Sequence, residues 1–368
     1  MTRRLIIKVG SALLYDQSSQ SFRAEWLSEL ASDIAMLREH DIDVAIVSSG
    51  AIALGCHRLG LPRDNLSLPQ KQACAATGQV ILTQAYEAAF AEHGILSAQI
   101  LLTLNDTENR RRWLNARATL SELIALGIVP IINENDTVAT DEIRYGDNDR
   151  LAARTAQMTG ADTLILLSDI NGLYTEDPRI EKSAQHIEII NKITPDISAM
   201  GGDANAVGGL GSGGMATKLM AAQIATQAGC SMCIMDGRES RPIKRLLGDE
   251  KASWFQAARN PKDARRQWIM GHLDIKGTIT IDDGALTALK AGKSLLAAGI
   301  TAQHGEFIKG DTVSVLSREK VEVARGIIAY NAAETEKIAG RKSSEFQSIL
   351  GYDNGMALIH RDNLVMTG

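Results

Sequence analysis

The chain has 368 residues, which is enough for two domains with separate cores. Its 45% hydrophobic and 23% charged residues are typical of a soluble globular protein, and its net charge of −5 argues against a broad nucleic-acid-binding surface. The sequence contains no apolar run of about 18 residues, the length that a membrane span needs. Because MTRRLIIKVG is too short an apolar run for a signal peptide, we expect a cytoplasmic protein with no membrane partner and no nucleic-acid partner.

Strand-like and helix-like segments alternate along the chain as far as the polar stretch RNPKDARR. Strands are expected at 4–9, 43–47, 96–102, 128–133, 163–169 and 230–235. Helices are expected at 24–39, at 69–92, up to about residue 126, and from Met215 to the stop at Gly229. This alternation predicts an α/β fold, a three-layer αβα sandwich around a mostly parallel sheet.

A glycine-rich stretch, GGLGSGGMATK, runs from Gly208 into the start of the last of these helices. Glycines let a backbone approach a ligand closely, and a helix amino terminus attracts anions. Lys218 falls in the first helical turn, where its side chain leans back over the loop. The stretch predicts a phosphate-binding cradle, although a flexible surface loop would look similar. It lacks the P-loop pattern, and its GxGxxG spacing is not preceded by a convincing strand.

Polar residues follow several of the predicted strands, at the sheet edge where open α/β folds bind ligands. Lys8 lies near the end of the first strand, as either a ligand contact or a side chain that reaches water. Ser48 and Ser49 begin a tight turn, as either a helix cap or a contact to an anionic substrate. Carboxylates and amides cluster at 133–136 and 146–149, and could bind an amino group, magnesium or each other.

The chain after Trp268 has a different texture, with short segments of alternating polarity separated by Gly, Asp and Asn turns. We therefore expect a catalytic domain at 1–258, a linker at 259–268 and a small, mostly β domain at 269–368. Cys230 and Cys233 lie in a CxxC spacing, but with no second pair they are expected to be buried strand residues.

Six motifs occur in an order that resembles the glutamate 5-kinases of the amino-acid kinase family. They are KVGSALL, VSSGAIALG, INENDTVAT, GDND, SDINGLYTEDPR and GGLGSGGMATK. The resemblance covers the whole chain, and the C-terminal part is similar to a PUA domain. Ser11 and Ser48 stand where the family often has threonine, and both keep the hydroxyl group.

The resemblance implies phosphorylation of the γ-carboxylate of L-glutamate by ATP, the first step of proline synthesis. Lys8 and Lys218 would bind the transferring phosphoryl group, and Asp149 would orient both lysines. ATP would contact Lys8, Ser168, Asp169, Ser212, Gly213, Gly214, Met215, Ala216, Thr217 and Lys218. Glutamate would contact Ser49, Asp136 and Asn148, with Asp136 accepting from its ammonium group. Magnesium would bind mainly through the ATP phosphates, and no protein ligand is assigned to it.

Further expectations concern partners. Proline is expected to inhibit by occupying the glutamate subsite, and the chain is expected to form a homo-oligomer, a dimer or a tetramer. A transient transfer of product to glutamyl phosphate reductase is a further expectation. The alternative functions are an acetylglutamate or aspartate kinase of the same family, and an RNA-binding regulatory protein that acts through its PUA-like domain.

Overall fold

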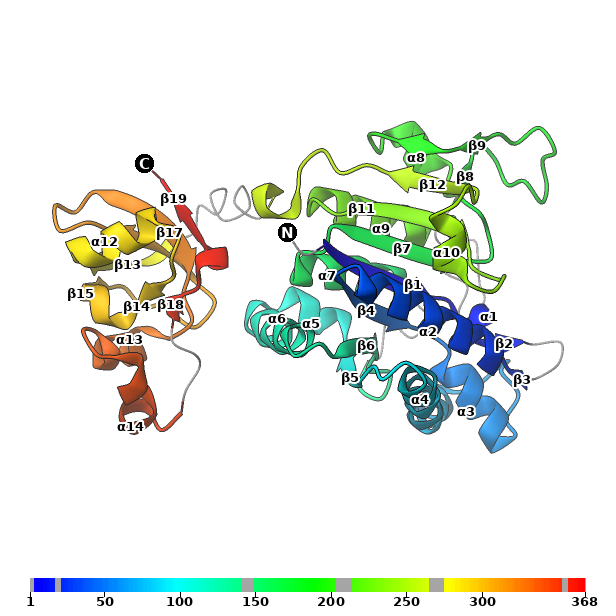
Figure 1. Cartoon of the computed structure of the whole chain (residues 1–368), viewed down its shortest axis with the longest axis horizontal. Coiled ribbons are helices and arrows are strands. Elements are labelled where there is room, and N and C mark those ends of the chain that lie inside the picture. Colours follow the sequence, from blue (N-terminus) through cyan, green and yellow to red (C-terminus); the bar gives the residue numbers. More distant parts are fainter. Residues whose placement is uncertain are drawn as a thin grey trace. The chain divides into compact units, whose positions relative to one another are not determined.

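The computed structural model describes residues 3–16, 21–139, 148–202, 214–264, 275–352 and 357–367. The chain divides into two compact units, Met1–Pro261 and Lys262–Gly368. Figure 1 shows the elements of each unit, which are described separately below.

The first unit is built on an eight-stranded sheet with the strand order β10-β12-β11-β7-β1-β4-β6-β5. The six strands from β11 to β5 in this order are parallel, and β12 runs antiparallel to β11. The strands are β1 (Arg3–Val9), β4 (Ile42–Ser48), β5 (Ser97–Leu102), β6 (Val129–Glu134), β7 (Thr163–Ser168), β10 (Ile189–Ile190), β11 (Ser231–Asp236) and β12 (Ala252–Phe255). The predicted, mostly parallel sheet is confirmed.

Helices cover both faces of this sheet, which gives three layers. Its helices are α1 (Ser11–Leu14), α2 (Ala24–Glu39), α3 (Ala51–Leu59), α4 (Leu68–Ala91), α5 (Leu104–Glu108), α6 (Arg110–Ala125), α7 (Asn148–Thr159), α8 (Pro195–Ala199), α9 (Met215–Gln227) and α10 (Pro242–Leu246). Two short hairpins pair β2 (Tyr15–Asp16) with β3 (Ser21–Phe22), and β8 (Leu173–Tyr174) with β9 (His186–Ile187).

The alternation of side chains along β1 decides which residues reach each layer. Leu5, Ile7 and Val9 belong to the core that contains side chains of α2, α3 and α4. Ile6 belongs to the opposite core, with side chains of α6, α7 and α9. Because side chains alternate between the two faces of a strand, Lys8 points to the same face as Ile6. It therefore points toward the layer that contains α7 and α9.

Helices α3 and α4 pack against each other through two glycines. A Cβ atom on Gly55 would lie 1.8 Å from the carbonyl oxygen of Cys74, and one on Gly78 would lie 1.8 Å from that of Ala51. Only a residue without a Cβ allows such a close approach of two backbones. This contact places α4 firmly beside α3, which starts at the end of β4.

Cys230 immediately precedes β11 and Cys233 lies within it, and both side chains are fully buried. Burial raises the pKa of both thiols, so they remain protonated at neutral pH. Both cysteines are therefore buried as expected, although Cys230 lies just outside the strand.

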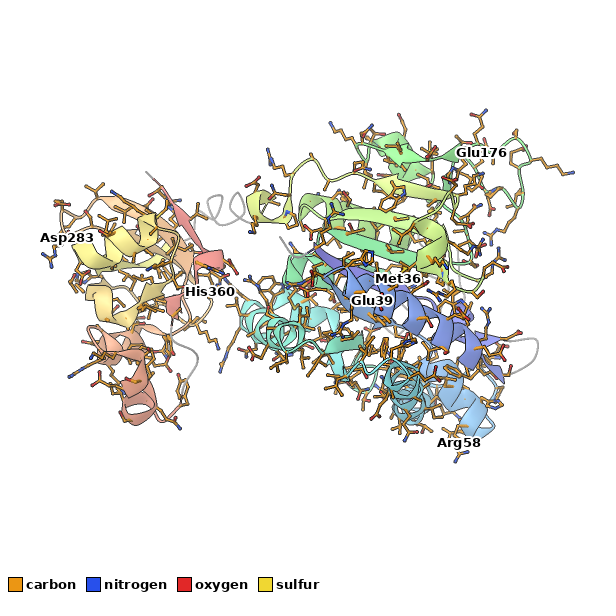
Figure 2. The ribbon with its side chains drawn as sticks, viewed as in Figure 1. Met36, Glu39, Arg58, Glu176, Asp283 and His360 are labelled. Carbon is orange, nitrogen blue, oxygen red and sulfur yellow. The ribbon has the colours of Figure 1, made fainter. Side chains whose placement is uncertain are left out.

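The second unit contains a five-stranded sheet with the order β15-β13-β16-β17-β19 and a separate β14–β18 pair. Its strands are β13 (Ile275–Ile281), β14 (Leu295–Leu296), β15 (Ile300–His304), β16 (Thr312–Leu316), β17 (Glu322–Ile327), β18 (Ala357–Ile359) and β19 (Leu364–Met366). Its helices are α12 (Asp283–Lys290), α13 (Ala332–Ile338) and α14 (Phe346–Leu350). Figure 2 labels Asp283 at the start of α12, and the unit has its own apolar core with Phe307, Tyr330 and Phe346.

Candidate active site

Two lysines and one aspartate meet beyond the carboxyl end of β1. Lys8 Nζ lies 2.6 Å from Asp149 Oδ1, and Lys218 Nζ lies 3.1 Å from Asp149 Oδ2. Lys8 comes from β1, Asp149 from the first turn of α7 and Lys218 from the first turn of α9. The structure thus brings together three residues that lie on three separate elements and are at least 69 positions apart in the chain.

This charged cluster is almost fully removed from water. The exposed fractions of Lys8, Asp149 and Lys218 are 8%, 1% and 5%. Burial alone would raise the pKa of the Asp149 carboxyl group, but the two neighbouring ammonium groups outweigh burial and hold that pKa well below its usual range. With two positive charges and one negative charge, the three side chains together carry a net charge of +1. Such a cluster is suited to a polyanionic ligand.

The start of α9 lies beside this cluster. Gly214 is the N-cap residue, and Thr217 Oγ1 lies 2.8 Å from the Gly214 carbonyl oxygen and 3.3 Å from Asp149 Oδ2. Met215 and Ala216 complete the first turn and are partly buried. The amino terminus of a helix adds its own attraction for anions. Ser212 and Gly213, which the sequence assigns to the nucleotide, lie outside the described residues.

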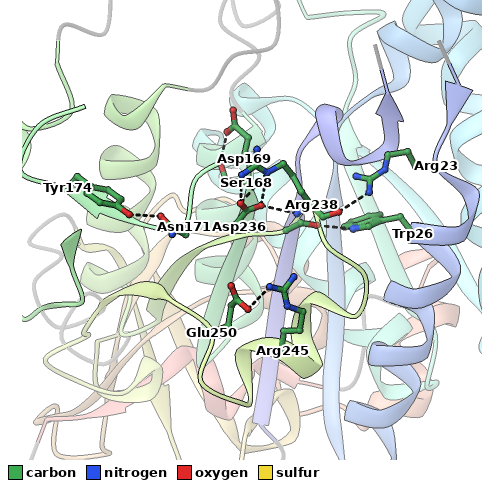
Figure 3. A network of polar contacts seen from close by, with 11 residues as sticks. Arg23, Trp26, Ser168, Asp169, Asn171, Tyr174, Asp236, Arg238, Arg245 and Glu250 are labelled. Carbon is green, nitrogen blue, oxygen red and sulfur yellow. Dashed lines mark hydrogen bonds and ion pairs between the residues drawn. The ribbon is translucent and has the colours of Figure 1, made fainter. Parts of the chain in front are cut away.

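Ser168 and Asp169 follow β7, the strand next to β1. Ser168 Oγ donates to Asp169 Oδ1 at 3.1 Å, and the backbone N–H of Gly237 donates to the Ser168 carbonyl oxygen at 2.9 Å. Figure 3 shows these residues beside Asp236, whose carboxylate accepts from Arg238 Nε at 3.0 Å. The ends of β7 and β11 therefore form one polar patch at the same edge of the sheet as Lys8.

Asn148, the first residue of α7, belongs to a network of neutral side chains next to the charged cluster. Asn148 Nδ2 lies 2.7 Å from Ser49 Oγ, 3.1 Å from the Ser48 carbonyl oxygen and 3.1 Å from Asn133 Oδ1. Asn133 Nδ2 donates in turn to Gln79 Oε1 of α4 at 2.7 Å. The network connects the ends of β4 and β6 with the start of α7.

Helix α4 supports the end of β4 through a second hydrogen bond. Tyr86 is fully buried and its hydroxyl group donates to Ser48 Oγ at 3.0 Å. Burial raises the pKa of Tyr86, so its hydroxyl group stays neutral and able to donate. Gly50 follows with a φ of 103°, a left-handed conformation that glycine adopts readily, and begins α3. The turn thus holds Ser49 at the edge of the sheet.

Asp136 is placed differently from the other predicted residues. It lines a cavity of about 410 Å³ between α4, β5 and the loop after β6, together with Gln79, Thr83, Gln99 and Glu134. Burial raises the pKa of Asp136 to about 6. Among the described residues, no hydrogen bond connects Asp136 to Asn148 or Ser49.

The charged cluster fits the phosphates of a nucleotide, because its lysines and the start of α9 face the same edge of the sheet. Within the part of the chain that is described, no group of three or more His, Cys, Asp or Glu side chains could hold a metal ion. A hard cation such as magnesium often keeps several waters and binds through substrate phosphates. The residues present are therefore compatible with magnesium held by a nucleotide.

Sequence reasoning missed three residues of this site. Asn133 stood in a recognised polar cluster but had no assigned role, whereas Gln79 and Tyr86 were simply part of a helix. Their seven-residue spacing places them on one face of α4, and this is the only signal that could have linked them. Nothing in the sequence shows that this face meets the ends of β4 and β6.

Each of the two units matches a known protein family or domain. The amino acid kinase family matches residues 3–236, and the PUA domain matches residues 277–350. A glutamate 5-kinase from Rhizobium etli (strain CIAT 652) is 52% identical over 365 residues, which are 99% of this chain and 93% of the relative. A glutamate 5-kinase from Ruegeria sp. (strain TM1040) is 51% identical, over 99% of this chain and 98% of the relative.

Among solved structures, a UMP kinase from Ureaplasma parvum matches with a TM-score of 0.47 at 17% identity, over 70% of this chain and 99% of that chain. No described helix is both long enough and apolar enough to cross a membrane.

Proposed function

The chain belongs to the amino acid kinase family and, within it, to the glutamate 5-kinases, and we propose that it transfers the terminal phosphoryl group of ATP to the γ-carboxylate of L-glutamate. The products are ADP and L-glutamyl 5-phosphate, and the reaction is the first step of proline synthesis. The observation that carries the proposal is the buried contact of Lys8 and Lys218 with Asp149. A carboxylate acceptor is already ionised at neutral pH, so this reaction needs no general base.

The charged cluster is assigned to the phosphoryl group in this proposal. Transfer between two anions depends mainly on positioning and charge stabilisation. Lys8 and Lys218 would neutralise the charge that develops on the transferring group, and Asp149 would keep both ammonium groups in place. ATP would supply the phosphoryl group and bind through Lys8, Ser168, Asp169 and residues 212–218, with magnesium on its phosphates.

The neutral network is assigned to glutamate. Ser49, Asn148 and Asp136 would contact the substrate, with Asp136 pairing with its ammonium group. Because both hydrogens of the Asn148 amide group face protein acceptors, its Oδ1 atom is the group that could accept from a substrate. Asn148 Oδ1 is buried and has no hydrogen-bond partner among the described residues.

The direct test is ATP turnover with L-glutamate, N-acetylglutamate and L-aspartate, with acyl phosphate detected as its hydroxamate. We expect by far the highest kcat/KM with L-glutamate, because an N-acetylated substrate carries no ammonium group for Asp136 and L-aspartate is one methylene group shorter. Turnover with N-acetylglutamate or aspartate instead would identify one of the related carboxylate kinases.

The proposal extends to regulation and assembly. Proline would inhibit by occupying the glutamate subsite, so raising the glutamate concentration should relieve the inhibition. The enzyme would be a cytoplasmic dimer or tetramer that transfers its unstable product to glutamyl phosphate reductase. Inhibition by proline that no glutamate concentration relieves would exclude a shared subsite.

A further inference from the structure

Gln79 of α4 contacts Asn133, a member of the neutral network that is assigned to glutamate, and the mechanism above gives Gln79 no role. Its exposed fraction is 9%, and its Oε1 atom accepts from Asn133 Nδ2 at 2.7 Å. A buried amide that makes one short hydrogen bond to a site residue can control how that residue is oriented.

Two backbone groups determine which atom of each amide faces which neighbour. The backbone N–H of Glu134 can only donate, so the Asn133 atom that lies 2.9 Å from it must be the oxygen. The NH₂ group of Asn133 then points toward Gln79, which must offer an acceptor. The contact therefore requires an acceptor at position 79.

The same reasoning applies to Asn148. The carbonyl group of Ser48 can only accept, so the Asn148 atom that lies 3.1 Å from it must be the nitrogen. This nitrogen also faces Asn133 Oδ1 and Ser49 Oγ. Asn148 Oδ1 is consequently directed away from these groups and remains available as an acceptor.

We propose that Gln79 is a positioning residue that, through Asn133, holds Asn148 with its carbonyl oxygen toward the amino group of the substrate. We call the three side chains Gln79, Asn133 and Asn148 the amide relay. The proposal rests on the proposed function in one respect, since it takes the ligand to be a carboxylate that carries an ammonium group.

Without an acceptor at position 79, the NH₂ group of Asn133 would be buried without a partner. A buried unsatisfied group is unfavourable, so Asn133 would turn toward another acceptor and withdraw its oxygen from Asn148. The NH₂ group of Asn148 would then be held only by the Ser48 carbonyl group and Ser49 Oγ, and it would turn toward the ammonium group more often. Two donors facing each other bind poorly.

The experiment compares three variants. Gln79→Met has a similar length and no strong acceptor, Gln79→Glu keeps an acceptor toward Asn133, and Gln84→Met is the matched control. Gln84 lies on the same helix and lines the same cavity but is exposed. Each variant is assayed with L-glutamate and with glutarate, which has the same two carboxylates and no amino group, and each is checked by thermal melting.

We expect Gln79→Met to lower kcat/KM for glutamate about tenfold, the scale of one buried hydrogen bond. The KM for ATP and the kcat/KM for glutarate should stay within about twofold of wild type, since neither involves the amino group. Gln79→Glu should restore glutamate turnover to within about threefold, and Gln84→Met should resemble wild type. If Gln79→Met gives no cooperative melt, Gln79→Leu, which also has no acceptor, replaces it.

Equal losses with glutamate and glutarate would show that Gln79 acts only on general structure, and the proposal would be wrong. Loss of activity in Gln79→Glu equal to that in Gln79→Met would also overturn it.

A measurement without substrate tests the positioning role of Gln79 independently of the proposed function. The side-chain NH₂ signals of Asn148 in ¹⁵N NMR spectra should exchange with water at least tenfold faster in Gln79→Met than in Gln84→Met. Unchanged exchange would exclude the amide relay, whether or not the wild type phosphorylates glutamate.

Discussion

Asn148 and Asp149 are neighbours in the chain and yet belong to two different kinds of site. Asp149 lies between two buried ammonium groups, whereas Asn148 lies among neutral amides, a hydroxyl group and a backbone carbonyl group. Consecutive residues of a helix point about 100° apart, so the first turn of α7 can serve two regions at once. We refer to them as the phosphoryl side and the substrate side.

The two sides differ in what determines their specificity. On the phosphoryl side, charge and position matter, and an ammonium group attracts any anion that reaches it. On the substrate side, the outcome depends on which atom of each amide donates and which accepts. Substitutions should therefore change turnover on the first side and discrimination between substrates on the second.

The largest effect is expected from Lys218→Ala, which should lower kcat by roughly 10²- to 10³-fold, the scale for losing one preorganised charge-stabilising group. Asp149 would keep Lys8 as its partner at 2.6 Å, so the variant should still melt cooperatively. Steady-state kinetics with ATP and glutamate measure the effect. Lys244→Ala, at an exposed position of α10, is the control and should stay within about twofold of wild type.

Activity of Lys218→Ala within about threefold of wild type would remove Lys218 from the mechanism, because one lost charge-stabilising contact lowers rates far more than that. Stabilisation of the transferring group would then be assigned to Lys8, held in place by Asp149.

A smaller effect is expected from Asp136→Asn, on the substrate side. Removing a charged partner of the ammonium group should raise the KM for glutamate by about 10- to 100-fold, with the KM for ATP nearly unchanged. The two KM values, measured with the other substrate saturating, test this directly. A rise in the KM for ATP alone would assign Asp136 to the nucleotide or its metal instead.

The pH dependence should also separate the two sides. Burial favours the protonated form of Asp136 and raises its pKa to about 6, so its negative charge is lost as the pH falls through that value. The kcat/KM for glutamate should therefore decrease about tenfold per pH unit below pH 6. The pKa of Asp149 is held well below its usual range, so the phosphoryl side stays charged over the same interval.

Profiles of wild type and Asp136→Asn between pH 5 and 8 test this point. The variant should have no step near pH 6, since an amide does not titrate. A step that persists in Asp136→Asn would show that another group controls glutamate binding.

Sequence patterns predicted the first unit well, because its buried parallel strands and amphipathic helices differ clearly in period. The segment 24–39 is a helix with those bounds, and Lys8 lies at a strand end as expected. In the second unit, the segments GTITIDDGA, DTVSVLS, VEVARGII and MALIHRDN alternate in polarity and overlap β13, β16, β17 and β18, whereas β14, β15 and β19 were not predicted. β15 is largely polar and partly exposed, whereas β14 and β19 have only two and three residues, which is too short for a periodic pattern.

The site was predictable where charged residues follow strands and stayed hidden where neutral residues act from a helix. Lys8 attracted attention as a charge near the end of an apolar run, Lys218 as a first-turn lysine after a glycine-rich loop, and Asp149 as part of a cluster of carboxylates and amides. Gln79 and Tyr86 carry no such signal, since a glutamine or tyrosine inside a helix is ordinary. Their importance follows only from the close α3–α4 contact at Gly55 and Gly78, which places α4 beside the ends of β4 and β6.

The smallest effect is expected from removing the second unit altogether. Every residue assigned to either side of the site lies before Gly229, and the two units have separate cores. The cut must follow β12, which belongs to the large sheet, and should also follow Asn260. A Cβ atom on Gly229 would lie 2.5 Å from the backbone of Asn260, so this segment packs against the first unit.

A chain that ends after Pro261 should therefore fold and form glutamyl phosphate at a rate within about threefold of the full chain, since no group that stabilises the transferring charge is lost. The measurements are a cooperative melt and the hydroxamate assay on both proteins. A truncated chain that melts cooperatively but forms no product would show that the second unit contributes to one of the two sides, and the assignment of both to the first unit would be wrong.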